Sequence, residues 1–189
     1  IVEELVRRAL SPSGLEAKAA LKALAFNDDP LALDGILPRT MDPDRDVADV
    51  ARAALAERAR RGEARAQAII LDDLTSNIGL PDMAYLAVLD AFPASDRVND
   101  LLHALSGSSE LAVRLVADAS RLRRGDPEVV ELFERRLANP DLVPRVNALR
   151  AVAAAHRVLG EAHWDALAAR NDQDEVAPLL QIFAAAVDQ

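Results

Sequence analysis

The side chains that could do chemistry are few in this sequence, and they match no known catalytic or metal-binding motif. Cysteine is absent, and the histidines are His103, His156 and His163. His156 and His163 flank Gly160, but a zinc site needs three or four converging ligands, and no His-Glu-x-x-His spacing occurs. A nucleophile elbow and a phosphate-binding glycine loop are also missing. We therefore expect no enzymatic activity, no cofactor and no metal.

Two kinds of acidic segment suggest a metal site or paired carboxylates, and helix ends or solvated turns explain both better. Asp42–Asp46 opens like an EF-hand calcium loop, but Val47 stands where Gly is needed and Ala53 where Glu is needed. Acidic residues at the start of a helix are favoured by the helix dipole without any ligand. Asp28–Asp29 and Asp72–Asp73 are neighbours in sequence, and neighbours on a helix point to different faces.

Arginines gather at two points of the chain, around Gly62 and just before Gly125. Cations near the C-terminus of a helix stabilise it without any ligand, which is the simpler interpretation. The alternative is a basic edge that docks an acidic peptide or a phosphate. The residues of this candidate basic edge are Arg58, Arg61, Arg65, Arg121, Arg123 and Arg124.

The overall charge argues against nucleic acid as the main partner. Among 189 residues, 22 Lys and Arg stand against 31 Asp and Glu, which gives a formal net charge of −9. Such a chain repels a phosphate backbone on average. No apolar run approaches the roughly 20 residues of a membrane-spanning helix. With no targeting segment visible, we expect a cytoplasmic protein.

Helices must position these side chains. Hydrophobic residues make up 51% of the sequence but aromatic residues only 3%, so the apolar mass is Ala, Leu and Val. Alanine has the highest helix propensity and lets helix axes approach closely. Seven glycines and ten prolines are too few for a loop-rich β protein. The composition therefore predicts an all-α fold.

The predicted helices recur with a nearly constant period. A polar turn, an apolar anchor and an Ala/Leu-rich helix follow one another six times, and consecutive anchors are 32, 33, 31, 32 and 33 residues apart. This regularity is typical of repeat proteins. A second apolar segment lies between successive anchors, so each repeat has a helix A, a short turn and a helix B. The anchors are Leu15, Val47, Leu80, Leu111, Val143 and Val176.

Glycines and prolines agree with this division. Gly62, Gly125 and Gly160 fall between a helix B and the next helix A, where the left-handed conformation that ends a helix suits glycine. Gly35 lies inside a predicted helix A, so the second repeat is predicted to be irregular there. We expect one domain over residues 1–189, with repeats at approximately 1–26, 27–60, 61–92, 93–123, 124–158 and 159–189.

Two of the B segments resemble the second half of a HEAT repeat. They are the Asp-Pro-Asp…Val…Ala-Ala-Leu run of Asp42–Leu55 and the Asn-Pro-Asp-Leu-Val…Val…Ala-Leu run of Asn139–Leu149. The period is similar to that of short bacterial HEAT-like repeats. Ala48, Pro144 and Ala177 stand where the family usually has an arginine. The resemblance covers the whole chain and implies a right-handed α-solenoid, a superhelix of about six antiparallel two-helix repeats.

The resemblance also implies a function. B helices usually line the concave side of such a solenoid, and that surface binds partners. We expect a non-catalytic protein–protein interaction scaffold that binds another protein or peptide. The alternatives are an accessory or regulatory domain of a larger enzyme of the lyase-associated type and, less favoured, a nucleic-acid-binding protein. Helical phase and family analogy place these residues on the B-helix surface, with Tyr85 as an exposed aromatic: Arg52, Tyr85, Arg114, Asp118, Asn147, Arg150 and Gln181.

Both ends of the sequence resemble internal segments. The last predicted helix, residues 176–187, carries almost no charge, whereas the end of a free solenoid needs a polar outer face. The sequence also opens on Ile1 rather than Met. We therefore expect it to be part of a longer protein, or one of its ends to pack against a partner.

Overall fold

The computed structural model describes residues 1–137 and Asp141, and every regular element in this part of the chain is a helix. This confirms the predicted all-α class. Contacts divide the chain into two compact units, Ile1–Pro93 and Ala94–Gln189. None of the helices described is long and apolar enough to cross a membrane. The organisation as one domain over residues 1–189 stays a prediction.

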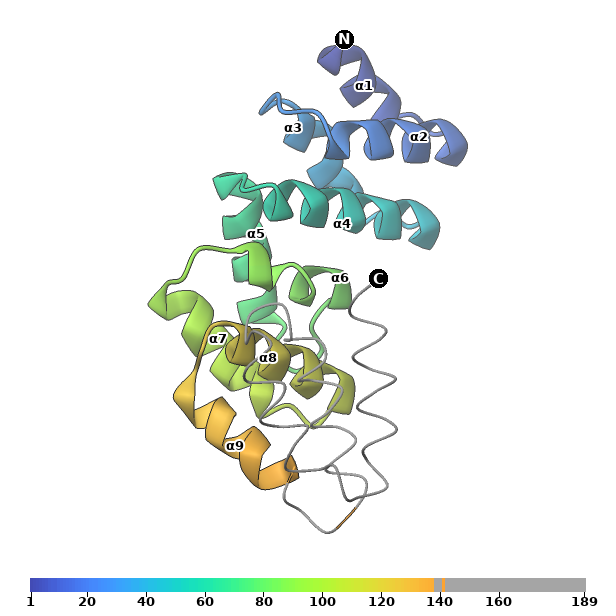
Figure 1. Cartoon of the computed structure of the whole chain (residues 1–189). Helices are drawn as coiled ribbons and strands as arrows, with labels where there is room; N and C mark the ends of the chain where they lie inside the picture. Colours follow the sequence, from blue (N-terminus) through green and yellow to red (C-terminus); the bar gives the residue numbers. More distant parts are fainter. Residues whose placement is uncertain (138–140, 142–189) are drawn as a thin grey trace, which may run out of the picture. The chain divides into compact units, whose positions relative to one another are not determined.

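The helices of the first unit pack as consecutive pairs. They are α1 (Val2–Ala9), α2 (Gly14–Ala25), α3 (Ala32–Ile36) with the 3-10 turn η1 (Leu37–Arg39), α4 (Arg45–Arg60), α5 (Ala64–Ser76) and α6 (Met83–Leu86) with the 3-10 turn η2 (Leu89–Ala91). The most extensive packing joins α2 to α4 and α1 to α2, and α4 also contacts α5 and α6. Figure 1 shows α2 and α4 side by side. The second helix of each pair therefore contacts the second helix of the next.

Small side chains form part of the buried faces of α2 and α4. Ala17 and Ala20 are buried on α2, and Ala51 and Ala54 are buried on α4. The distance between two packed helix axes depends on the side chains at the contact, so alanines allow a close approach. The alanines that are abundant in the composition thus contribute to the buried faces of these two helices.

Gly35 is tightly packed in the first unit. A Cβ at this position would lie 2.8 Å from Cδ1 of Leu24, 3.2 Å from Cα of Val6 and 3.4 Å from Cβ of Ala9. The helix α3 has only five residues and continues directly into η1, which contains Pro38. The irregularity predicted at Gly35 is therefore confirmed, and it accompanies a close approach of α3 to α1 and α2.

The described part of the second unit repeats the same alternation. The helix α7 (Asp96–Ser106) packs against α8 (Leu111–Arg123), and α8 contacts α9 (Pro127–Leu137). The turns after α4 and α8 contain Gly62 and Gly125, whose φ values are +93° and +74°. The left-handed conformation predicted at these two glycines is thus confirmed. The predictions for Val143, Gly160 and Val176 lie outside the described residues.

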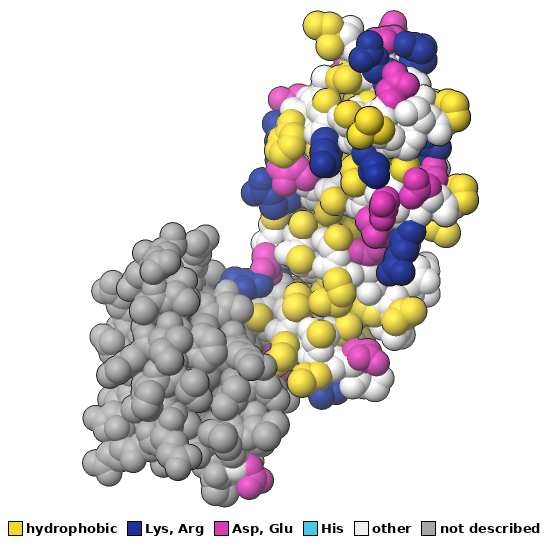
Figure 2. Space-filling model, turned by 90° about the vertical axis from the view of Figure 1, so that its right-hand side faces the viewer, with side chains coloured by type: hydrophobic (Ala, Val, Ile, Leu, Met, Phe, Trp, Pro, Cys, Tyr) yellow, Lys and Arg dark blue, Asp and Glu magenta, His cyan; other side chains and the backbone are white. Residues whose placement is uncertain are grey.

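Apolar side chains remain exposed where α2 and α4 begin and just before α6. Leu15, Met41 and Leu80 are 81%, 87% and 83% exposed. Figure 2 looks onto the beginnings of α2 and α4 and shows hydrophobic side chains distributed among acidic and basic ones. Three of the predicted anchors, Leu15, Leu80 and Leu111, are therefore surface residues, whereas Val47 is buried in the core.

Candidate functional site

A groove of about 230 Å³ lies between α2 and α4. Counted from Lys22 in the first segment and from Val50 on α4, the other lining positions lie three, four or seven residues later, a spacing that places them on one helix face. Both helices belong to the B segments of the predicted repeats. The lining residues are Lys22, Ala25 and Phe26 from the end of α2 and Val50, Ala53, Ala54 and Glu57 from α4.

Phe26 gives the groove an exposed aromatic ring. It follows directly after the last residue of α2, and its backbone N–H donates to carbonyl groups of that helix. Its side chain is 65% exposed, whereas Tyr85 and Phe92 are each 4% exposed. A large apolar side chain held in solvent beside an apolar groove is a feature of binding surfaces.

The two ionisable groups of the groove carry opposite charges. Glu57 on α4 accepts two hydrogen bonds from Arg60, at 2.7 and 2.8 Å. The Arg60 guanidinium lowers the pKa of Glu57 below its ordinary value, so Glu57 is a stable anion. Lys22 on α2 makes no hydrogen bond or ion pair among the described residues. One turn earlier on α2, Lys18 lies 3.8 Å from Asp46 of α4.

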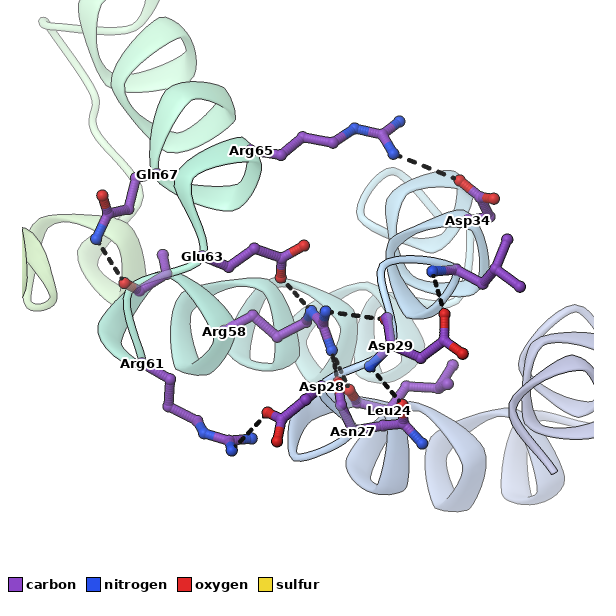
Figure 3. Close-up of polar contacts among 12 residues, drawn as sticks. Leu24, Asn27, Asp28, Asp29, Asp34, Arg58, Arg61, Glu63, Arg65 and Gln67 are labelled. Atoms are coloured by element: carbon purple, nitrogen blue, oxygen red, sulfur yellow. Dashed lines mark hydrogen bonds and ion pairs between the residues drawn. The ribbon is translucent and has the colours of Figure 1, made fainter.

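Arg58, predicted on the candidate basic edge, is instead a buried structural residue. Its side chain is only 5% exposed, and it ends against the carbonyl groups that follow α2 (Figure 3). The guanidinium donates to the backbone carbonyls of Leu24 and Asp29, each at 3.1 Å, and to that of Asn27. Its Nε donates to the carboxylate of Glu63, the N-cap residue of α5. Arg58 therefore ties together three segments of the first unit.

The neighbouring arginines of this edge also face carboxylates of the preceding helix pair. Arg61 lies 2.7 Å from Asp28, and Arg65 lies 3.7 Å from Asp34 (Figure 3). A second cleft of about 290 Å³ occurs here, and its lining includes Asp28 and Glu63 as well as Arg58 and Arg61. Because these cations are already paired with anions, this edge offers little positive charge to a phosphate.

A buried arginine paired with nearby carboxylates also occurs before Gly125. Arg121 is 8% exposed, and its guanidinium contacts Asp126 at 2.8 Å and Glu128 at 3.3 Å. Burial lowers the pKa of Arg123 and Arg124 below the ordinary arginine value. The sequence signal for this pairing was present as a six-residue pattern, Arg-x-Arg-Arg-Gly-Glu/Asp, at 58–63 and 121–126. In both copies the first arginine pairs with the acidic residue after the glycine.

The residues predicted on the B-helix surface are mostly engaged or buried. Arg52 donates to the carbonyl of Thr40 at 3.0 Å and pairs with Asp82 at 2.8 Å. Arg114 donates to the carbonyls of Ser108 and Ser109, at 2.6 and 3.0 Å. Both guanidinium groups are therefore held by hydrogen bonds, and that of Arg52 is also paired with a carboxylate. Asn147, Arg150 and Gln181 lie outside the described residues.

The expectation of an exposed Tyr85 is wrong. The ring is 4% exposed, and burial raises the pKa of its hydroxyl, with a smaller contribution from the carboxylates of Asp82 and Asp73. The helix α6 has only four residues, which are too few for helical phase to predict which side faces the core. Asp118, placed on the same surface by phase, is 2% exposed and is also corrected.

The acidic segment before α4 serves as a helix cap. Asp44 accepts a hydrogen bond from the backbone N–H of Asp46 at 3.0 Å, and Asp42 accepts one from that of Asp44 at 2.8 Å. Asp42 also pairs with Arg39. Within the described residues, no three His, Asp or Glu side chains converge as a metal site. In comparisons with known proteins, the sequence matches no family model and no curated protein.

Proposed function

We propose that this chain is a HEAT-like helical-repeat scaffold that binds another protein over its B helices, at the groove between α2 and α4. The consecutive helix pairs support the repeat architecture, as do the contacts of α4 with both α2 and α6. Gly62 and Gly125, two periods apart, end corresponding helices in the same left-handed conformation. Repeats of this kind stack on their neighbours and offer extended binding surfaces.

The observation that carries the proposal is the apolar groove with Phe26 at its edge. Its volume of about 230 Å³ lies below the roughly 300–1,000 Å³ of pockets that enclose a small molecule. The groove is therefore better suited to a few side chains of a protein partner. Complete burial of an exposed Phe side chain contributes about 1.5–3 kcal/mol, so Phe26 alone supplies a useful part of a binding energy.

The lining also supports a binding role over a catalytic one. Its ionisable groups are Lys22 and Glu57, and the remaining lining residues are Ala, Val and Phe. Because Arg60 lowers the pKa of Glu57, this carboxylate is a poor proton donor near neutral pH. We propose a non-catalytic scaffold on this ground.

Substitution of Ala53 tests the proposal. Ala53 is an exposed groove residue, and glutamate suits a helix, so Ala53→Glu fills the groove without disrupting α4. Ala68→Glu, at an exposed position of α5 outside the groove, is the matched control. Proteins captured from a lysate of the source organism by the wild-type chain are identified and purified, and their Kd for each variant is measured.

We expect Ala53→Glu to weaken binding of at least one captured protein about tenfold or more, as a substitution at a central interface position does. Ala68→Glu should leave that Kd unchanged. Equal binding of every captured protein to the wild type and Ala53→Glu would contradict the proposed function. Circular dichroism of both variants checks that the helices remain intact.

A further inference from the structure

Three of the seven residues that line the α2–α4 groove are alanines. Ala25 lies on α2, and Ala53 and Ala54 lie on α4. Packed helix axes are 8–10 Å apart, and the smaller the side chains at the contact, the closer the axes. Alanines at these lining positions therefore let a third helix lie along α2 and α4 with its own larger side chains pointing into the groove.

The length of the groove also matches a helix. Val50 and Glu57 line it seven residues apart on α4, which corresponds to about 10 Å, or two helical turns. Phe26 stands at the end of α2 with most of its ring exposed. A partner helix would place apolar side chains at i, i+3, i+4 and i+7 against these residues, as helices do in hydrophobic grooves.

The two sides of the groove differ in charge. On the α2 side, Lys22 has no partner among the described residues, and Lys18 is one turn away at 3.8 Å from Asp46. On the α4 side, Glu57 is an anion, and Asp49 lies two turns earlier with its side chain 56% exposed. Among the lining residues, Lys22 carries the unpaired charge, and an acidic side chain of a partner would neutralise it.

We infer that the groove binds an amphipathic α-helix that carries a carboxylate beside its apolar stripe, on the side that faces Lys22 of α2. This inference rests on the proposed function and specifies the chemistry of the partner. A nucleic acid is disfavoured because the lining, which is otherwise Ala, Val, Phe and the paired Glu57, offers a single cation, Lys22, to the phosphates. An extended strand is disfavoured because the groove has no open row of backbone N–H and C=O groups, its walls being helices.

A library of helical peptides tests this chemistry directly. Displayed 18-residue helices, randomised over one face and its two flanks, are selected on the full-length chain and counter-selected on Ala53→Glu. We expect the enriched peptides to carry an apolar i, i+3, i+4, i+7 stripe and an excess of Asp or Glu on one flank. Enrichment of basic flanks, or the absence of any Ala53-dependent peptide, would overturn the inference.

Exchanging the charge of Lys22 with that of the peptide's acidic residue tests where the peptide's carboxylate lies. Lys22→Glu should weaken a selected peptide by about two- to fivefold, the range of a solvent-exposed ion pair, and a peptide whose flanking acid is replaced by Lys should recover that loss. Arg45→Glu changes the net charge equally, at an exposed residue outside the groove lining, and should have no such effect. Equal losses in the two variants, or no recovery with the exchanged peptide, would place the acid elsewhere and refute the inference.

The lysate experiment separates this inference from the proposed function. If captured proteins depend on Ala53 but bind through an extended or basic segment, the scaffold function stands and the inference fails. If no captured protein and no peptide depends on Ala53, both fail.

Discussion

Arg58 places its guanidinium among the backbone carbonyl groups at the end of α2 and in the turn that follows. The last four carbonyls of a helix have no intrahelical donor, and here Leu24 and the turn residues Asn27 and Asp29 receive N–H groups from one side chain. The carboxylate of Glu63 also accepts a hydrogen bond from this side chain. At the scale of single residues, an arginine that the sequence placed on a charged edge is thus buried, and its side chain connects α4 with the turn after α2 and with the start of α5.

Replacing Arg58 by Met should destabilise the chain strongly. The substitution keeps an apolar stem but removes every side-chain donor. Glu63 and the carbonyl of Asn27 then lose the hydrogen bonds that Arg58 gives them, whereas the other two carbonyls keep a backbone N–H donor. Loss of one member of a buried ion pair costs about 3–5 kcal/mol. Urea denaturation followed by circular dichroism measures the change. Arg60→Met, at a side chain that is 58% exposed, should cost less than about 1 kcal/mol. A loss no larger than that of Arg60→Met would contradict the connector role.

Asp73 provides a pH-dependent prediction. Burial, and then the nearby carboxylate of Asp82, raise its pKa above the ordinary value. The folded protein therefore holds this proton more tightly than the unfolded chain, and the associated stability is present at low pH and is lost as the pH rises through the folded-state pKa. Asp73→Asn should accordingly raise the Tm at pH 7 by a small amount and leave it nearly unchanged at pH 3.

The hydrogen bond from Asn77 supports the choice of asparagine, because an amide oxygen at position 73 can still accept it. Asp100→Asn, at an exposed position of α7, is the control and should show no comparable difference between the two pH values. Thermal unfolding by circular dichroism at both pH values gives the comparison. A lower Tm for Asp73→Asn at pH 7 would show that the charge stabilises the fold.

At the scale of elements, the local signals in the sequence were reliable where one residue decides the conformation. The left-handed turns at Gly62 and Gly125 follow from glycine placed after a helix. The groove, in contrast, depends on two helices of different repeats, and no single stretch encodes it. The sequence pointed to the B helices, and the groove does lie between two of them. Helical phase and family analogy placed Tyr85 on this surface, whereas Phe26 follows the end of a helix and carries no periodic signal.

Gly35 makes a prediction about the packing of α3. A Cβ at this position would lie only 3.2 Å from the backbone Cα of Val6, and a backbone atom cannot move aside as the Leu24 side chain can. Gly35→Ala should therefore destabilise the chain by about 1–3 kcal/mol, as overpacking does. At Gly79, a Cβ would meet nothing within 4 Å. Gly79→Ala is the matched control and should be neutral, or stabilising by up to about 1 kcal/mol.

Urea denaturation of the two glycine variants distinguishes steric packing from a general effect of alanine. If Gly35→Ala is as stable to urea as Gly79→Ala, the close approach of α3 to α1 and α2 is not required for the stability of the fold. A loss confined to Gly35→Ala supports it.

At the scale of the whole molecule, the sequence predicted repeats whose contacts are mainly with their neighbours. Such proteins derive their stability from each repeat and from the interfaces between adjacent repeats. The contacts of α2 with α4 and of α4 with α5 and α6 are of this kind. The partner could not be predicted to the same degree, because a helical pattern shows which residues are apolar but not which apolar residues stay uncovered after the helices pack.

The division after Pro93 predicts that the first unit folds by itself. Residues 1–93 contain complete helix pairs and a buried core that includes Leu21, Leu55 and Leu74. A domain with its own core is able to fold alone. We expect this fragment to show a helical circular dichroism spectrum and a cooperative urea transition with an m value of about 1 kcal/mol/M or more. A fragment of residues 1–60 lacks the helices that cover α4 on one side and should unfold at lower urea.

Since the groove belongs to α2 and α4, the fragment of residues 1–93 should also bind a selected helical peptide with the Kd of the full-length chain. A fragment without a cooperative transition would show that the first unit needs the rest of the chain.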